Sequence, residues 1–290
     1  MVRWLDRLIA LNDRWAAPFG EFNHRWLTAL FRPIRPIKDL LHGTWLGHPL
    51  HPASTDLPIG AFLVALVLDL AGQPQAALVA TAVGQVTFLL SMLSGLADYT
   101  DTDGRARIRA TIHGTIMVVA GALTAGSMIL RDGGAASGSA PTILLAVGLA
   151  VILLGAYIGG DVVFALGNMV SRHAFRGPGT KWVRLDTGDV VDLGRLPEAT
   201  PTKMRAGIND LVLVRVGDTV HALHAVCAHA GGPLDAGTVT PDGCLECPWH
   251  GARYRLADGH NRRGPSVYDQ PAYEIRAAEG GGYEVRRAAS

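Results

Sequence analysis

The sequence has little charge, few cysteines and no long run of charges of one sign. Only 18% of its 290 residues are Asp, Glu, Lys or Arg, against about 25% in an ordinary soluble domain, and 49% are hydrophobic. This composition argues against a single water-soluble globule. Three cysteines are too few for a small secreted fold held by disulfides. A net charge of +1 offers no basic surface for DNA or RNA, so we expect no nucleic-acid partner.

The charges are unevenly distributed along the chain. Residues 53–170 contain 4 Lys or Arg and 7 Asp or Glu, whereas residues 171–290 contain 15 and 14. Mean hydropathy over the whole chain is +0.22. We therefore expect a multi-domain membrane protein, with an apolar domain in lipid followed by a C-terminal domain in water.

Four apolar stretches predict transmembrane helices at about 56–72, 77–97, 110–130 and 142–164, within a domain spanning 48–172. Each is close to the roughly 20 residues that cross a hydrocarbon core. Their short connections predict an all-α four-helix bundle in contact with the lipid bilayer, with small residues such as Gly84 and Gly121 for packing. Asp69 lies near the end of the first helix, where we expect it to be solvated.

The N-terminal segment, 1–47, alternates aromatic and leucine residues with charged ones, which is typical of amphipathic helices at a membrane interface. It lacks the apolar core of a secretory signal. Lys and Arg precede the first predicted helix, follow the fourth and lie between the second and third, whereas the other two loops contain only Arg131. The positive-inside rule then predicts a multi-pass protein of the cell inner (cytoplasmic) membrane, with both termini and the C-terminal domain cytoplasmic.

Two short motifs in the C-terminal half combine cysteine with histidine. They are Cys227-Ala-His229 and Cys247-Pro-Trp-His250. A structural zinc site with two Cys and two His usually has the cysteines together and the histidines together. Two separate Cys/His pairs instead favour a [2Fe–2S] centre in which two His replace two Cys on one iron.

The stretches CAHAGGPL, from Cys227, and CPWHGARY, from Cys247, resemble the two cluster loops of Rieske proteins, and the resemblance to Rieske ferredoxins extends over about 181–287. It implies an all-β domain, 181–290, of antiparallel sheets with two cluster-binding loops, after a linker at 173–180. It also implies that Cys227 and Cys247 bind the inner iron and that His229 and His250 bind the outer one. Pro265 falls where a third loop covers the cluster. A zinc site or a lost cluster remains the alternative.

Three further positions are expected to surround the cluster. Respiratory Rieske proteins have a disulfide whose cysteines match Gly232 and Trp249 here, so no such disulfide can form. Where this chain has Ala252, the respiratory proteins have a serine that donates a hydrogen bond to the cluster. Tyr254 matches a tyrosine of those proteins that is a second donor. We therefore expect a potential in the lower half of the Rieske range of about −150 to +300 mV. The third cysteine, Cys244, is interpreted as a structural thiol or as a sulfur near the cluster.

The sequence HPLHPASTDLPIG resembles the signature of a bacterial family of four-helix membrane proteins of unknown function, covering about 40–172. In the predicted topology His51 and His113 lie at the same level of the bundle, with His48 nearby. Facing histidines in a bundle can hold a b-type haem. A quinone site and a hydrogen-bonded bundle end are the alternatives.

Together these features predict a membrane-anchored Rieske-type protein that transfers one electron between unknown donor and acceptor proteins. The C-terminal domain leaves no room for the catalytic iron domain of Rieske oxygenases, so we expect an electron-transport component of an oxidoreductase system rather than a complete enzyme. Two alternatives remain. The bundle could be a second redox site of a quinol- or b-haem-linked oxidoreductase, or the chain could be a non-enzymatic redox sensor.

Overall fold

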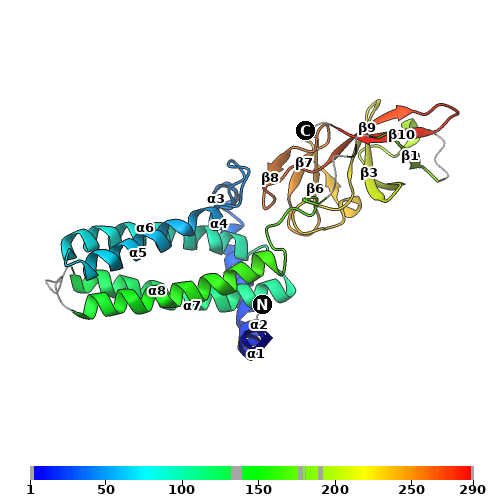
Figure 1. Ribbon diagram of the computed structural model, residues 1–290. Helices are drawn as coiled ribbons and strands as arrows, with labels where there is room; N and C mark the ends of the chain where they lie inside the picture. Colours follow the sequence, from blue (N-terminus) through cyan, green and yellow to red (C-terminus); the bar gives the residue numbers. More distant parts are fainter. Residues whose placement is uncertain (1–2, 132–138, 176–178, 180, 189–191, 289–290) are drawn as a thin grey trace. The chain divides into compact units, whose positions relative to one another are not determined.

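The computed structural model describes the chain except residues 1–2, 132–138, 176–178, 180, 189–191 and 289–290 (Figure 1). The chain divides into two compact units, a helical unit of Met1–Leu41 and Pro49–Asn168, and a β unit of His42–His48 and Met169–Ser290. The linker expected at 173–180 lies partly outside the described residues. Helices followed by a β-rich domain confirm the predicted fold class.

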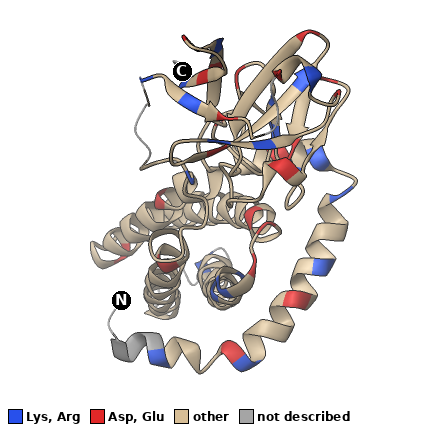
Figure 2. Cartoon of the chain, turned by 90° about the vertical axis from the view of Figure 1, so that its right-hand side faces the viewer, with Lys and Arg blue, Asp and Glu red and all other residues tan. Residues whose placement is uncertain are grey.

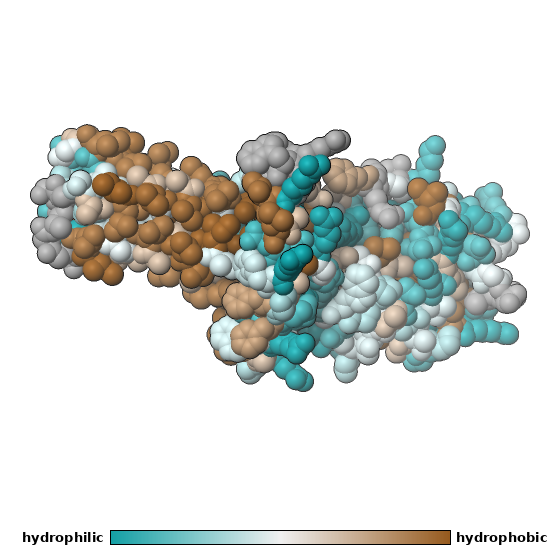
Figure 3. Space-filling model, turned by 90° about the horizontal axis from the view of Figure 1, so that it is seen from below, coloured by the Kyte–Doolittle hydropathy of each residue, from teal (hydrophilic) through white to brown (hydrophobic). Residues whose placement is uncertain are grey.

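The helical unit begins with three amphipathic helices and continues with a short helix and four long ones. They are α1 (Arg3–Ala10), α2 (Asp13–Phe31), α3 (Arg35–His42), α4 (Leu50–Ser54), α5 (Asp56–Leu70), α6 (Pro74–Tyr99), α7 (Gly104–Leu130) and α8 (Ser139–Phe164). Four segments are long and apolar enough to cross a membrane: Leu50–Leu70, which joins α4 and α5, and then α6, α7 and α8. The surface of these helices is largely hydrophobic in the face that Figure 3 shows.

Large apolar side chains fill the interior of the bundle. Phe62, Phe88 and Leu145 are buried among the long helices, where α5 packs along α6 and α7 packs along α8. A Cβ atom at Gly84 would lie 2.6 Å from the Phe62 ring, and one at Gly121 would lie 2.8 Å from the Phe88 ring. These two glycines therefore make room for aromatic rings, as the packing interpretation predicts.

One end of the bundle is closed by a buried ion pair. The Arg131 guanidinium donates to both carboxylate oxygens of Asp69, and the Thr142 hydroxyl donates to Asp69 Oδ2 at 3.1 Å. The Asp69 side chain is 3% exposed and that of Arg131 is fully buried. The expectation of a solvated Asp69 was wrong, because a partner 62 residues away encloses the carboxylate.

Helix α2 packs against α6 and α7 on one side and presents aromatic residues on the other. The Tyr99 hydroxyl donates to the Gly20 carbonyl at 3.0 Å and is 2.7 Å from the Thr111 hydroxyl. The exposed large apolar residues of this helix are Trp15, Phe19, Phe22, Trp26 and Leu30. Lys, Arg, Asp and Glu are interspersed along the N-terminal helices (Figure 2). This combination suits the membrane interface that the sequence predicts.

The β unit contains a closed antiparallel barrel and a small second sheet. The barrel has the order β1-β10-β9-β4-β3-β2, with β1 (Val183–Asp186), β2 (Thr202–Ala206), β3 (Asn209–Val216), β4 (Thr219–His224), β9 (Ala272–Ala277) and β10 (Tyr283–Arg287). A two-residue turn, Gly217-Asp218, joins β3 to β4, and Gly217 takes the positive φ (+59°) that such turns favour. Closure of the barrel leaves no unpaired edge among these six strands.

The second sheet carries one of the two cysteine motifs, and the barrel carries the other. The order of the second sheet is β5-β6-β7-β8, with β5 (Thr238–Val239), β6 (Cys244–Glu246), β7 (Arg253–Arg255) and β8 (Asn261–Arg263). The first motif follows β4 and the second joins β6 to β7. Leu234, Leu245 and Tyr254 form one buried cluster with Cys227 and Cys247. The apolar residues that fold this sheet thus also bury the two thiols.

Candidate metal centre

The fold brings together the four side chains that the sequence singled out. The thiols of Cys227 and Cys247 are hydrogen-bonded to each other, with the residues 1% and 3% exposed. The ring centroids of His229 and His250 are 5.0 Å apart, with the planes at 86°. His229 is buried and His250 is half-buried. Two sulfur donors and two nitrogen donors therefore form two adjacent pairs.

The two cysteine loops have the same backbone geometry. In each loop the cysteine N–H donates to the carbonyl five residues later, and the N–H four residues later donates back to the cysteine carbonyl. The bonds are Cys227 to Gly232 (2.9 Å) and Gly231 to Cys227 (3.0 Å), then Cys247 to Ala252 (2.8 Å) and Gly251 to Cys247 (3.0 Å). Gly231 and Gly251 both have positive φ, at +87° and +74°, which favours glycine. The fold thus presents the two thiols through equivalent turns.

The two thiols differ in acidity. Their shared hydrogen bond and burial raise the pKa of the Cys227 thiol, whereas the same hydrogen bond lowers the pKa of Cys247 to about 7. Metal binding replaces the protons of such thiols. Within the described parts of the chain, no group of three or more His, Cys, Asp or Glu side chains is placed to hold a metal ion. Pairs are what a Rieske centre requires, because each of its two irons takes two protein ligands.

The positions that correspond to the respiratory disulfide lie against each other. A Cβ atom on Gly232 would lie 2.8 Å from the Cys247 sulfur and 3.0 Å from the Trp249 ring. The indole of Trp249 thus packs over Gly232, and Trp249 is 53% exposed. Glycine at 232 leaves the space that the indole and the sulfur occupy.

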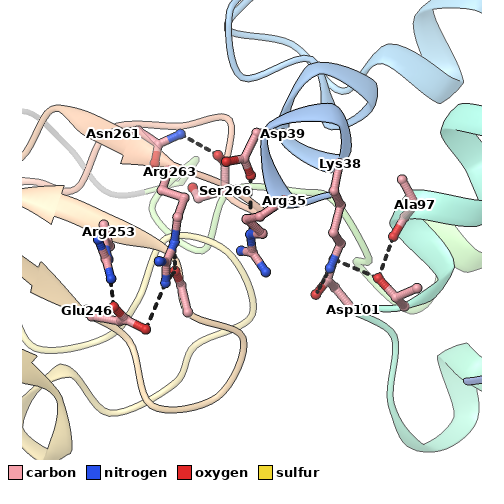
Figure 4. A network of polar contacts seen from close by, with 12 residues as sticks. Arg35, Lys38, Asp39, Ala97, Asp101, Glu246, Arg253, Asn261, Arg263 and Ser266 are labelled. Atoms are coloured by element: carbon pink, nitrogen blue, oxygen red, sulfur yellow. Dashed lines mark hydrogen bonds and ion pairs between the residues drawn. The ribbon is translucent and has the colours of Figure 1, made fainter. Parts of the chain in front are cut away.

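A salt-bridge network holds the second loop (Figure 4). Arg263 donates twice to the Gly251 carbonyl, from Nε at 2.9 Å and from Nη2 at 2.6 Å. Glu246 accepts from Arg253 at 2.6 Å and from Arg263 at 2.7 Å. Burial alone would raise the pKa of Glu246, but the two arginines outweigh it and lower that pKa. Pro265, two residues after Arg263, is buried and follows a cis peptide bond.

The first loop is supported by a residue that sequence reasoning missed. Gln270 accepts from the Ala228 N–H at 2.8 Å and donates to the carbonyls of His224 (2.6 Å) and Val226 (2.8 Å). Gln270 is 1% exposed. It lies more than 40 residues from the loop, so no local pattern marks it.

The chain just after the helical unit also runs along this loop. His173 donates from Nε2 to the Val226 carbonyl at 2.8 Å, and the Arg172 N–H donates to the Ala228 carbonyl at 3.0 Å. The His173 and His224 rings are 4.5 Å apart and both residues are buried. These two histidines therefore belong to the packing behind the cluster loop.

We expect Gln270→Leu to destabilise the first loop. The substitution keeps the bulk of the side chain but leaves the Ala228 N–H and two carbonyls without this partner, at about 1–3 kcal/mol for each buried group left unsatisfied. Urea titration of the purified protein, followed by the visible absorption of the cluster, should show a lower midpoint. An unchanged midpoint would mean that the loop does not depend on this side chain.

We expect Tyr254→Phe to keep the cluster and lower its reduction potential. The Tyr254 hydroxyl is buried 3.1 Å from the Cys227 sulfur, and hydrogen bonds to cluster sulfurs raise the potential. One hydrogen bond of about 0.5–1.5 kcal/mol corresponds to roughly 20–60 mV for one electron. Tyr268→Phe is the control, because that hydroxyl donates to the Met169 carbonyl instead of a sulfur. Redox titration of both variants tests this, and equal potentials would contradict it.

Two of the histidines predicted for a membrane site, where His113 was expected to pair with His51 or His48, lie close together. The rings of His51 and His113 lie in the helical unit with centroids 6.2 Å apart. His48 clusters with the β unit instead.

Comparison with known proteins agrees with the geometry of the metal centre. The Rieske [2Fe-2S] domain family matches residues 187–274. The ferredoxin subunit of anthranilate 1,2-dioxygenase from Burkholderia cepacia is 33% identical over 91 residues, which are 30% of this chain and 83% of the relative. Ferredoxin CarAc from Metapseudomonas resinovorans is 32% identical over 76 residues, 26% of this chain and 70% of the relative.

A solved structure of a ferredoxin is also similar to part of the chain. The ferredoxin of carbazole 1,9a-dioxygenase from Nocardioides aromaticivorans IC177 is 28% identical, with a TM-score of 0.31, and the match covers 38% of this chain and all of that one. The two cysteine loops, the family match and the ferredoxin relatives lead to one conclusion: through its β unit, this chain belongs to the Rieske [2Fe–2S] family.

Proposed function

We propose that this protein is a membrane-anchored one-electron carrier whose [2Fe–2S] cluster is held by Cys227 and Cys247 on one iron and by His229 and His250 on the other. The supporting observation is the pair of equivalent loops, each presenting one thiol and one imidazole. The cluster supplies reversible one-electron chemistry when bound.

The residues around the ligands protect the site on one side and leave it accessible on the other. Leu234, Leu245 and Tyr254 exclude water from the two sulfurs. The half-buried His250 and the exposed Trp249 face outward, which gives a partner protein a short path to the histidine-ligated iron. Electron transfer needs such an approach and no substrate pocket.

The partners are electron donor and acceptor proteins. One ferredoxin relative is named as the ferredoxin subunit of anthranilate 1,2-dioxygenase, and the other is named as ferredoxin CarAc. A ferredoxin of this kind exchanges electrons with other proteins. We propose the same kind of exchange here, with the difference that four apolar helices hold this carrier at a membrane. The distribution of Lys and Arg supports the cytoplasmic face of the inner membrane for the β unit.

The first test is spectroscopic. Full-length protein purified in detergent from the membrane fraction should contain two irons and two sulfides per chain and give the electron paramagnetic resonance signal of a reduced Rieske cluster. Zinc in place of iron would overturn the cluster proposal. Protease added to sealed, right-side-out spheroplasts should leave the β unit intact, and its digestion would reverse the proposed orientation.

A further inference from the structure

We infer that the helical unit binds a second redox cofactor, a haem of the b type whose iron is ligated by His51 and His113. The inference concerns the bundle alone and does not depend on the cluster proposal. It rests on the ring nitrogens, on a repeated glycine arrangement and on the separation of the two rings.

The hydrogen bonds of both histidines fix the same tautomer. His51 Nδ1 lies 2.8 Å from the Ser91 carbonyl, and His113 Nδ1 lies 2.8 Å from the Gly155 carbonyl. A carbonyl oxygen only accepts, so Nδ1 carries the proton in each ring and Nε2 keeps its lone pair. Histidines that bind metals typically donate their other N–H to a backbone carbonyl or carboxylate in this way.

This arrangement occurs twice in the bundle, once between α4 and α6 and once between α7 and α8. In each case, the helix that receives the histidine has a glycine four residues after the accepting carbonyl, Gly95 after Ser91 and Gly159 after Gly155. A Cβ atom on either glycine would lie 2.9 Å from the imidazole. Each imidazole thus lies directly on a helix backbone, and only glycine leaves the space. Both α6 and α8 thus have a carbonyl that accepts from a histidine and a glycine that contacts the imidazole.

The spacing of the rings matches axial ligation. A metal between two Nε2 atoms is about 2.0–2.1 Å from each, and each nitrogen is about 1.1 Å from its ring centre, so the centroids should be about 6.3 Å apart. The centroids of His51 and His113 are 6.2 Å apart. The planes are inclined by 67°, which axial ligation allows because each ring can turn about its own metal–nitrogen bond.

The number of donors favours haem over a bare metal ion. A protein site for a single ion normally supplies three or four ligands. Among the described residues no such group of His, Cys, Asp or Glu is found, and the site offers two imidazoles. A haem needs two axial ligands from the protein, because its ring supplies four nitrogens. Ile112, next to His113 on α7, and Ile158, next to Gly159 on α8, are buried in one apolar cluster.

The test uses full-length protein purified in detergent, both as isolated and after titration with haemin. We expect about one haem per chain, measured as the pyridine haemochrome, with the sharp reduced-minus-oxidised bands of a six-coordinate b haem. His51→Ala and His113→Ala should each reduce haem content at least tenfold. His48→Ala is the matched control and should leave it unchanged.

Two glycine substitutions test the haem site without removing either histidine ligand. Gly159→Ala places a methyl group against the His113 ring and should weaken haemin binding at least tenfold. Gly114→Ala adds the same methyl to α7 where nothing lies within 4 Å, so binding should persist. The cluster signal and the elution volume report that each variant is folded. Failure of the wild-type protein to take up haemin, haem retained in both histidine variants, or a bound quinone without haem would each overturn the inference.

Discussion

Replacement of Cys247 by serine is expected to abolish the [2Fe–2S] cluster, with iron falling from two per chain to less than a tenth of that value. The Cys247 thiol is buried and hydrogen-bonded to the Cys227 thiol, and a serine hydroxyl does not ionise to a comparable ligand. No other thiol can take its place, because Cys244 bonds instead to Asp242, with its sulfur 3.7 Å from Oδ2.

The third cysteine provides the matched control. Cys244→Ser makes the same chemical change three residues earlier, at a buried position of β6. We expect this variant to keep both irons and its visible spectrum. Iron, zinc and sulfide analysis of the two purified variants measures the outcome. If the cluster survives Cys247→Ser but is lost in Cys244→Ser, the ligand is Cys244 and the assignment of Cys247 is wrong.

The cysteine loops could be predicted from sequence because their information is local. Cys227 and His229 lie within three residues, and Cys247 and His250 within four, so each loop carries its own pair of donors. The alternating apolar residues of the surrounding strands are also a short-range pattern. The structure brings the two loops together as predicted, while the assignment of the four residues as ligands stays a prediction.

Helix ends were less predictable than helix cores. The third long helix was expected to begin at 110, but α7 begins at Gly104 and includes three arginines in its first turns. Hydropathy detects the apolar core of a helix, whereas its polar end is held by other contacts. Arg107, for example, donates from Nε to the Thr102 carbonyl at 3.0 Å and pairs with Glu21 at 2.5 Å.

Contacts between distant residues could not be inferred at all. Gln270 has no sequence feature that points to the Ala228 amide 42 residues earlier. Gly95 and Gly159 could be identified only as small residues suited to helix packing. Their contact with an imidazole depends on which helices pair and in which register, which the tertiary structure alone determines.

The largest effect on stability is expected for Asp69→Leu. The substitution leaves the guanidinium of Arg131 buried without its counter-charge, and breaking a buried pair in this way costs about 3–5 kcal/mol. Asp56→Leu is the control on the same helix. That carboxylate is exposed, so its loss should change the free energy of unfolding by no more than about 0.5 kcal/mol.

A second substitution separates the pair from its surroundings. In the double variant Asp69→Leu, Arg131→Met both charges are absent, and a buried pair replaced by apolar residues of similar size is often neutral or stabilising. We therefore expect the free energy of unfolding of the double variant to be close to that of the wild-type protein and well above that of Asp69→Leu alone. Denaturant titration in detergent, followed by far-ultraviolet circular dichroism, gives the three free energies. If the double variant is as unstable as Asp69→Leu, the unpaired arginine is not the cause of the lost stability. The loss then comes from other contacts of the Asp69 carboxylate, such as the hydrogen bond from the Thr142 hydroxyl.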